Sequence, residues 1–148
     1  PWDAPRELMA RGSGDCEDFA IAKFFMLRAI GFGSGNQEIS LAYVMLATES
    51  GPRPHMVVLL TSSEAGPSDP LVLDYPALTV DRLSVRQDMR LVFQFDEQRI
   101  WGHGILRSSA LLSKWRRVLD GMNVGREAEH AGASFQKDFP LAPTAAVR

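Results

Sequence analysis

The sequence predicts an α+β fold in which one apolar helix packs on an antiparallel sheet. The helix is expected over residues 16–30, where a polar first turn is followed by a nearly continuous apolar run that Gly31 ends. The sheet is expected downstream, where runs rich in β-forming residues alternate with short Gly-, Pro- and Ser-rich loops. A helix this apolar is buried on most sides, so we expect it at the centre of the domain.

The first half of the sheet is predicted from three apolar runs with short connections. Residues 39–48 alternate in polarity, residues 55–61 are almost continuously apolar, and residues 71–75 form a short run that Pro76 stops. The segment 51–54, Gly-Pro-Arg-Pro, is predicted as the turn between the first two runs. Strands joined in this way favour an antiparallel meander packed on the helix.

The second half carries a weaker pattern. Residues 91–95 and 100–106 are predicted to form a hairpin, and residues 108–119 an amphipathic last helix. We expect one domain over residues 1–122 and a disordered tail over residues 123–148, where Gly, Ala and Pro accumulate without periodicity.

Composition narrows the class of protein. The 148 residues are 45% hydrophobic and 23% charged with a net charge of -2, as in an ordinary soluble domain without the basic surface of a nucleic-acid-binding protein. No apolar run approaches the roughly 18 residues needed to span a membrane, so we expect no membrane insertion. The single cysteine excludes an internal disulfide and a cysteine-based zinc cluster.

That cysteine, Cys16, lies in the predicted first turn of the central helix. Free N–H groups and the positive end of the helix dipole favour a thiolate there, and the same N–H groups could receive an oxyanion. The adjacent carboxylates of Asp15, Glu17 and Asp18 oppose a thiolate, unless a bound cation neutralises them. The alternative is that Cys16 is a small buried hydrophobic residue, which is the commonest role of a free cysteine.

A candidate base and a candidate acid lie on neighbouring predicted strands. His55 begins the second strand and Asp74 lies near the end of the third. An imidazole that takes the thiol proton, oriented by a carboxylate, is what a thiol nucleophile requires. The alternatives are that His55 caps a strand and Asp74 forms a turn. His103 and His130 are rival bases, which lack an acid partner on a strand.

Several segments carry a family resemblance: Trp2 to Pro5, Gly14-Asp15-Cys16-Glu17-Asp18-Phe19 with the following Ala20-Ile21-Ala22-Lys23, Pro54-His55-Met56-Val57-Val58-Leu59, Val72-Leu73-Asp74 and Ser113-Lys114-Trp115-Arg116-Arg117. With these segments the chain resembles the bacterial transglutaminase-like cysteine proteinases. The resemblance implies a papain/transglutaminase-like core in which the central helix carries the nucleophile Cys16 and the sheet carries the base His55 and the orienting acid Asp74.

The same resemblance implies a calcium-dependent endopeptidase, with Asp15 and Glu17 among the ligands of Ca²⁺. The family's other ligands lie upstream of the cysteine, so we expect the N-terminal part of the domain to be missing from this chain. A role for the Trp2 indole near the oxyanion is also compatible with the family.

For biology, the resemblance implies a periplasmic protease that cleaves the N-terminal region of a large surface adhesin near an Ala-Ala site and so controls biofilm attachment. It also implies an inner-membrane cyclic di-GMP receptor that sequesters the enzyme. Three alternatives stay open: a transglutaminase-like acyltransferase that uses an amine, a non-catalytic binding module of the same fold, and an inactive fragment.

Overall fold

The computed structural model describes residues 2–62, 69–77, 79–102 and 109–130. These residues form α-helices and one antiparallel sheet. The elements are α1 (Pro5–Arg11), α2 (Cys16–Ala29), β1 (Gln37–Thr48), β2 (Gly51–Ser62), β3 (Leu71–Leu73), β4 (Asp81–Arg82), the 3₁₀ turn η1 (Leu83–Val85), β5 (Met89–Phe95), β6 (Ile100–Trp101) and α3 (Ser109–His130). The predicted α+β class and the predicted central helix are confirmed.

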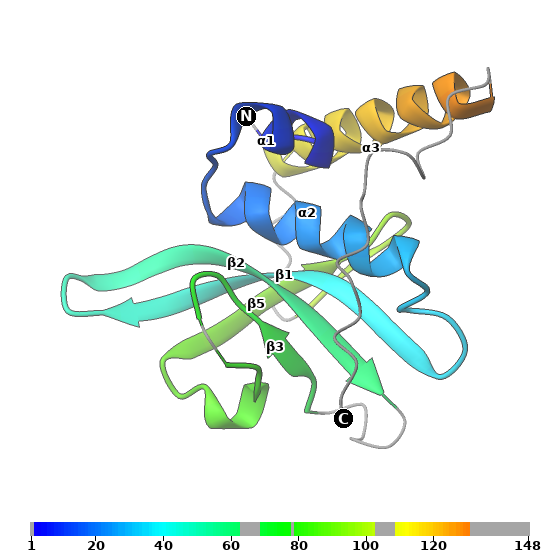
Figure 1. Cartoon of the computed structure of the whole chain (residues 1–148). Helices are drawn as coiled ribbons and strands as arrows, with labels where there is room; N and C mark the ends of the chain where they lie inside the picture. The colour runs from blue at the N-terminus through cyan, green and yellow to red at the C-terminus, as the bar shows by residue number, and fades with distance from the viewer. Residues whose placement is uncertain (1, 63–68, 78, 103–108, 131–148) are drawn as a thin grey trace, which may run out of the picture.

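The sheet has the order β4-β3-β2-β1-β5-β6. β1, β2 and β3 form the predicted antiparallel meander, and β5 and β6 form the predicted hairpin on the other side of β1. All three described helices lie on one side of the sheet, while the closed end of the long β1–β2 hairpin projects beyond it (Figure 1). None of the described helices combines the length and the hydropathy that crossing a membrane requires.

The predicted turn over residues 51–54 is wrong. These residues belong to β2, with Pro52 opposite Ala47 and Pro54 opposite Met45, and the chain reverses instead between Thr48 and Gly51. Proline fits a ladder where its nitrogen faces away from the paired strand. Within the described residues β3, the other neighbour of β2, pairs only from Val58 to Leu60, so Pro52 and Pro54 interrupt no ladder on that side.

The start of α2 is fixed by a carboxylate network. Asp15 caps the helix by accepting the Asp18 N–H at 3.2 Å, as its position in the sequence predicts. The buried Asp18 in turn accepts the Asp3 N–H at 2.9 Å and an Arg11 guanidinium N–H at 3.0 Å. These bonds tie the chain around α1 to the helix end that carries Cys16.

The main core lies between α2 and the sheet. Ile21 and Phe24 of α2 are fully buried, and Phe24 meets Phe25 and Trp115 edge to face. The strands contribute alternate residues to this face, and the others form a second cluster on the opposite face. That second cluster comprises Ala42, Val44, Val57, Leu59, Val72 and Met89.

The last helix is longer than predicted, ending at His130 rather than at residue 119. Gly121 does not end it, although glycine costs about 1 kcal/mol inside a helix. A Cβ at Gly121 would lie 3.6 Å from the Ala4 side chain, so α3 passes close to the start of α1 there and tertiary packing outweighs the propensity. Residues 103–108, part of the second predicted hairpin strand, and residues 131–148 lie outside the described residues. The boundary at residue 122 stays a prediction.

Replacing Phe24 with Ala should lower the free energy of unfolding by about 3–5 kcal/mol, because it removes a fully buried ring from the core. Urea denaturation followed by tryptophan fluorescence measures the change. Met26→Ala is the matched control on the same helix, since Met26 is 43% exposed and its loss should cost less than about 0.5 kcal/mol. Equal effects of the two substitutions would contradict the core assignment.

Candidate active site

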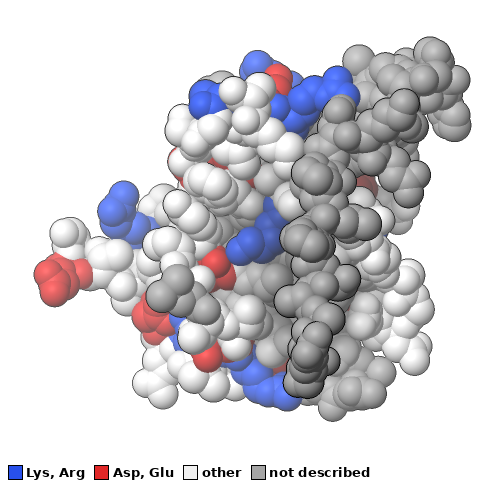
Figure 2. Space-filling model, viewed as in Figure 1, with Lys and Arg blue, Asp and Glu red and all other residues white. Residues whose placement is uncertain are grey.

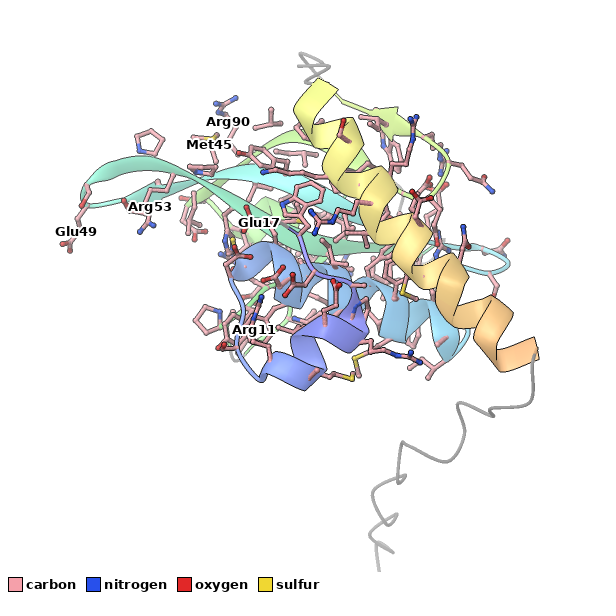
Figure 3. The ribbon with its side chains drawn as sticks, turned by 90° about the horizontal axis from the view of Figure 1, so that it is seen from above. Arg11, Glu17, Met45, Glu49, Arg53 and Arg90 are labelled. Carbon is pink, nitrogen blue, oxygen red and sulfur yellow. The ribbon has the colours of Figure 1, made fainter. Side chains whose placement is uncertain are left out.

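Cys16 is the first residue of α2 and is half-buried. Its position follows from Asp15, which caps the helix one residue earlier. The thiol Sγ–H donates to Glu17 Oε2 at 3.3 Å. Figure 3 shows Glu17 at the start of α2, whereas Glu49 and Arg53 lie far out on the β1–β2 hairpin. Cys16 thus lies among helix-end N–H groups, with a carboxylate on each side in the sequence.

His55 and Asp74 are in direct contact, as the sequence predicted for neighbouring strands. His55 Nε2 donates to Asp74 Oδ1 at 2.6 Å, and the two side chains are only 12% and 7% exposed. The pairing of Val58 with Leu73 ends the β2–β3 ladder, so Asp74 leaves the sheet close to the part of β2 that carries His55. The register of the β2–β3 pairing, which cannot be read from the sequence, brings His55 and Asp74 together.

The contacts of His55 favour its protonated form. The hydrogen bond to Asp74 and a second side-chain hydrogen bond with Cys16 raise the pKa of His55 from 6.5 to about 9, against the effect of burial. Since Asp74 occupies Nε2, Nδ1 is the ring nitrogen that is left for another partner. Burial acts to raise the pKa of Asp74, but hydrogen bonds from His55 and Arg86 outweigh it and hold this pKa below its usual value.

Helix α2 holds the segment after β3 through residues that the sequence analysis did not single out. Lys23 Nζ donates to the Asp74 backbone carbonyl at 3.2 Å, and burial lowers the pKa of Lys23. The rings of Phe19 and Tyr75 stack with centroids 4.2 Å apart. Cys16, Phe19 and Lys23 share one face of the helix, and this i, i+3, i+7 spacing was the available signal.

Tyr43 of β1 also belongs to these surroundings. Burial, followed by electrostatic interactions with Glu17 and Cys16, raises the pKa of Tyr43. Its ring stacks on Phe93 with centroids 5.2 Å apart. The phenol therefore lies within electrostatic range of the thiol, and no sequence pattern marked it.

Other candidates fall elsewhere. Trp2 is buried in the core, where its ring stacks on Phe95 with centroids 6.0 Å apart and Lys114 Nζ lies 5.7 Å from its centroid. These are the contacts of a packing residue, so the oxyanion role gains no support. His130 is the last residue of α3, and His103 lies outside the described residues.

The predicted calcium ligands Asp15 and Glu17 lie on either side of Cys16, each with a hydrogen bond of its own. A carboxylate with one bonded oxygen retains acceptor capacity for a cation. Calcium takes about six to eight oxygen ligands, however, and in the described part of the chain no three His, Cys, Asp or Glu side chains are grouped as a metal site. Taken alone, these residues fit only part of a calcium site.

Charge on the surface is mixed. Figure 2 shows Lys and Arg in small groups with Asp and Glu between them on the face in view, rather than one broad area of a single sign. This mixed distribution agrees with the net charge of -2.

The fold and these contacts define an α+β protein with a cysteine at a helix N-terminus and a hydrogen-bonded histidine–aspartate pair carried by the sheet and the segment after β3. No protein-family model and no curated protein matches the chain. Solved structures of Legionella pneumophila LapG do match: one is 32% identical, covers 82% of this chain and 62% of LapG, and has a TM-score of 0.68. The resemblance predicted from the sequence is confirmed, and the chain has a LapG-like protease fold.

LapG is similar to this chain in two further states. A calcium-bound form is 33% identical, covers 82% of this chain and 65% of LapG, and has a TM-score of 0.66. An EGTA-treated form is 33% identical with coverages of 82% and 63% and a TM-score of 0.68. The chain thus spans slightly less than two thirds of LapG.

The stability contributed by His55 should depend on pH. Its pKa rises from 6.5 to about 9 on folding, so the stabilisation is fully present below pH 6.5 and is lost as the pH rises through about 9. The difference in Tm between the wild type and His55→Gln should therefore be largest at pH 6 and shrink toward pH 10. Differential scanning calorimetry across this range measures it. A difference that is constant with pH would contradict the charged His55–Asp74 pair.

Proposed function

We propose that the chain is the core of a cysteine endopeptidase, with Cys16 as nucleophile, His55 as base and Asp74 as the acid that orients it. The observation that carries this proposal is the position of His55, which is bonded to Asp74 through Nε2 and lies near enough to Cys16 for the two side chains to interact. The likeness to LapG supports the same class of enzyme. Because the chain spans less than two thirds of LapG, the activity of the whole protein is part of the proposal.

The proposed reaction uses these residues in sequence. His55 Nδ1 takes the proton from Cys16, and the thiolate sulfur attacks the carbonyl carbon of the scissile peptide bond. The N–H groups at the start of α2 stabilise the oxyanion of the tetrahedral intermediate. Protonated His55 then gives its proton to the departing amine, which leaves a thioester on Cys16. A water deprotonated by His55 hydrolyses the thioester and restores the thiol.

Asp74 has two functions in this scheme. It fixes the imidazole so that Nδ1 faces the sulfur, and its negative charge stabilises the imidazolium that each proton transfer creates. The raised pKa of His55 is consistent with a thiolate–imidazolium pair in the resting protein. Lys23 and the Phe19–Tyr75 stack support this geometry by holding the backbone around Asp74 on α2.

We further propose that Asp15 and Glu17 supply part of a calcium site. The calcium-bound form of LapG supports this proposal. A divalent ion there would offset the negative charges beside the thiol. The remaining ligands would come from outside the described residues, in line with a family whose other ligands precede the cysteine.

The substrate and the cellular setting are also proposals that follow from the family resemblance. The substrate would be the N-terminal region of a surface adhesin with a small-residue Ala-Ala site, cleaved in the periplasm to release the adhesin and disperse a biofilm. An inner-membrane cyclic di-GMP receptor would sequester the enzyme.

His55→Ala should lower the rate of cleavage of a fluorogenic Ala-Ala peptide by about 10²- to 10⁴-fold, because general base catalysis is lost. Cys16→Ser should be inactive, and Asp74→Asn should lie between His55→Ala and the wild type. Arg28→Gln is the matched control, since Arg28 pairs with Glu97 away from this site.

Stable amide products formed with a labelled amine, without cleavage, would instead establish an acyltransferase. Iodoacetamide alkylation of Cys16 no faster than in His55→Ala would establish a binding module or an inactive fragment.

Calcium binding should weaken when either proposed ligand loses its charge. Isothermal titration calorimetry with Ca²⁺ should give a lower affinity for Asp15→Asn and for Glu17→Gln than for the wild type, because each removes a carboxylate ligand. Glu97→Gln is the control for loss of one negative charge elsewhere. Equal affinities of the wild type, Asp15→Asn and Glu17→Gln would contradict the assignment.

A further inference from the structure

Arg86 contacts the oxygen of Asp74 that His55 leaves free. Its Nη2 donates to Asp74 Oδ2 at 2.9 Å, while His55 holds Oδ1 at 2.6 Å. The Arg86 side chain is 15% exposed and the Asp74 side chain 7%. Each oxygen of the carboxylate therefore has its own hydrogen-bonding partner.

Arg86 is itself held in place. Its Nε donates to Asp88 Oδ1 and its Nη2 to Asp88 Oδ2, both at 2.9 Å. This two-point contact fixes the plane of the guanidinium and hence the direction of the N–H that points at Asp74. An ammonium of lysine could contact one of these carboxylates but could not match the fork geometry of both.

The backbone that carries Arg86 is tied to the start of β3. The Leu83 N–H donates to the Pro70 carbonyl at 2.9 Å, and Ser84 donates to Asp69 through its N–H at 2.8 Å and through Oγ at 2.7 Å. Arg86 and Asp74 thus branch from two ends of one hydrogen-bonded unit. The relative position of Arg86 and Asp74 is therefore set by backbone hydrogen bonds as well as by their side chains.

We propose that Arg86 is a positioning residue that fixes the Asp74 carboxylate for its contact with His55. The inference rests on the proposed function, in which Asp74 orients the base. Without Arg86, the carboxylate can rotate about its Cβ–Cγ bond and can turn toward the nearby cation Lys23. His55 would then lose the fixed partner that aims Nδ1 at Cys16. The titratable and charged groups around this pair are Cys16 and Lys23 from α2, and Arg86 with Asp88 from the segment after η1.

The experiment compares Arg86→Gln, Arg86→Lys and Arg86→Ala with the wild type, His55→Ala and the control Arg28→Gln. Arg28 is a good control because it also makes a two-point contact with a carboxylate, Glu97, and is partly buried. Three quantities are measured for each: the rate of Cys16 alkylation by iodoacetamide, kcat and KM for the Ala-Ala peptide, and Tm.

We expect Arg86→Gln to slow alkylation and lower kcat roughly tenfold, the scale of one lost charge-assisted hydrogen bond, with little change in KM. Arg86→Lys should lie between Arg86→Gln and the wild type. Millimolar guanidinium should restore part of the rate to Arg86→Ala and none to His55→Ala. Arg28→Gln should change Tm without slowing alkylation.

Two results would overturn the inference alone. The first is alkylation of Arg86→Gln as fast as in the wild type. The second is an equal loss of alkylation rate in Arg86→Gln and Arg28→Gln, in proportion to the fall in Tm, which would make Arg86 a purely structural residue. A wild type that alkylates no faster than His55→Ala would overturn the proposed function and this inference with it. Because the test of the proposed function compares only the wild type with His55→Ala, whereas the test of the inference uses the Arg86 variants, the two failures are distinguishable.

Discussion

The packing of α2 against the sheet is the constraint on which the rest of the molecule depends. Ile21 and Phe24 bury one face of the helix completely, which fixes its rotation about its own axis. That rotation determines the direction of the residues on the other face of the helix. It places Cys16, Phe19 and Lys23 toward the segment after β3. An apolar core contact thereby sets the position of Cys16, which does not itself lie in the core.

Carboxylates near the candidate site are shared between several donors rather than paired one to one. Asp18 receives bonds from two backbone N–H groups and Arg11, and Asp74 receives them from His55 and Arg86. A buried carboxylate is stable only when most of its acceptor capacity is used in this way. The consequence is rigidity: moving any one donor leaves a charge undercompensated, so helix α1, helix α2 and the β3–η1 segment hold one another in place.

Local patterns in the sequence predicted the elements that local interactions determine. Asp15 followed by Asp18 marked the helix start, and the apolar runs marked the long strands. The turn at residues 51–54 was misplaced because Gly-Pro-Arg-Pro is typical of a turn. Proline is tolerated in this part of β2 because β3 does not pair beside Pro52 and Pro54, and that depends on the tertiary structure. His55 and Asp74 were paired correctly as residues of adjacent strands. Arg86 was not found, because its contact with Asp74 depends on how η1 folds back on β3.

The prolines in β2 have a consequence for self-association. An unpaired strand edge recruits further strands through its N–H and C=O groups, and this is a common route to aggregation. Pro52 and Pro54 belong to the part of β2 that β3 does not pair with in the described structure, and neither has an N–H to offer. The strand that carries His55 can therefore stay open beside the candidate site without acting as a template for a second copy of the sheet.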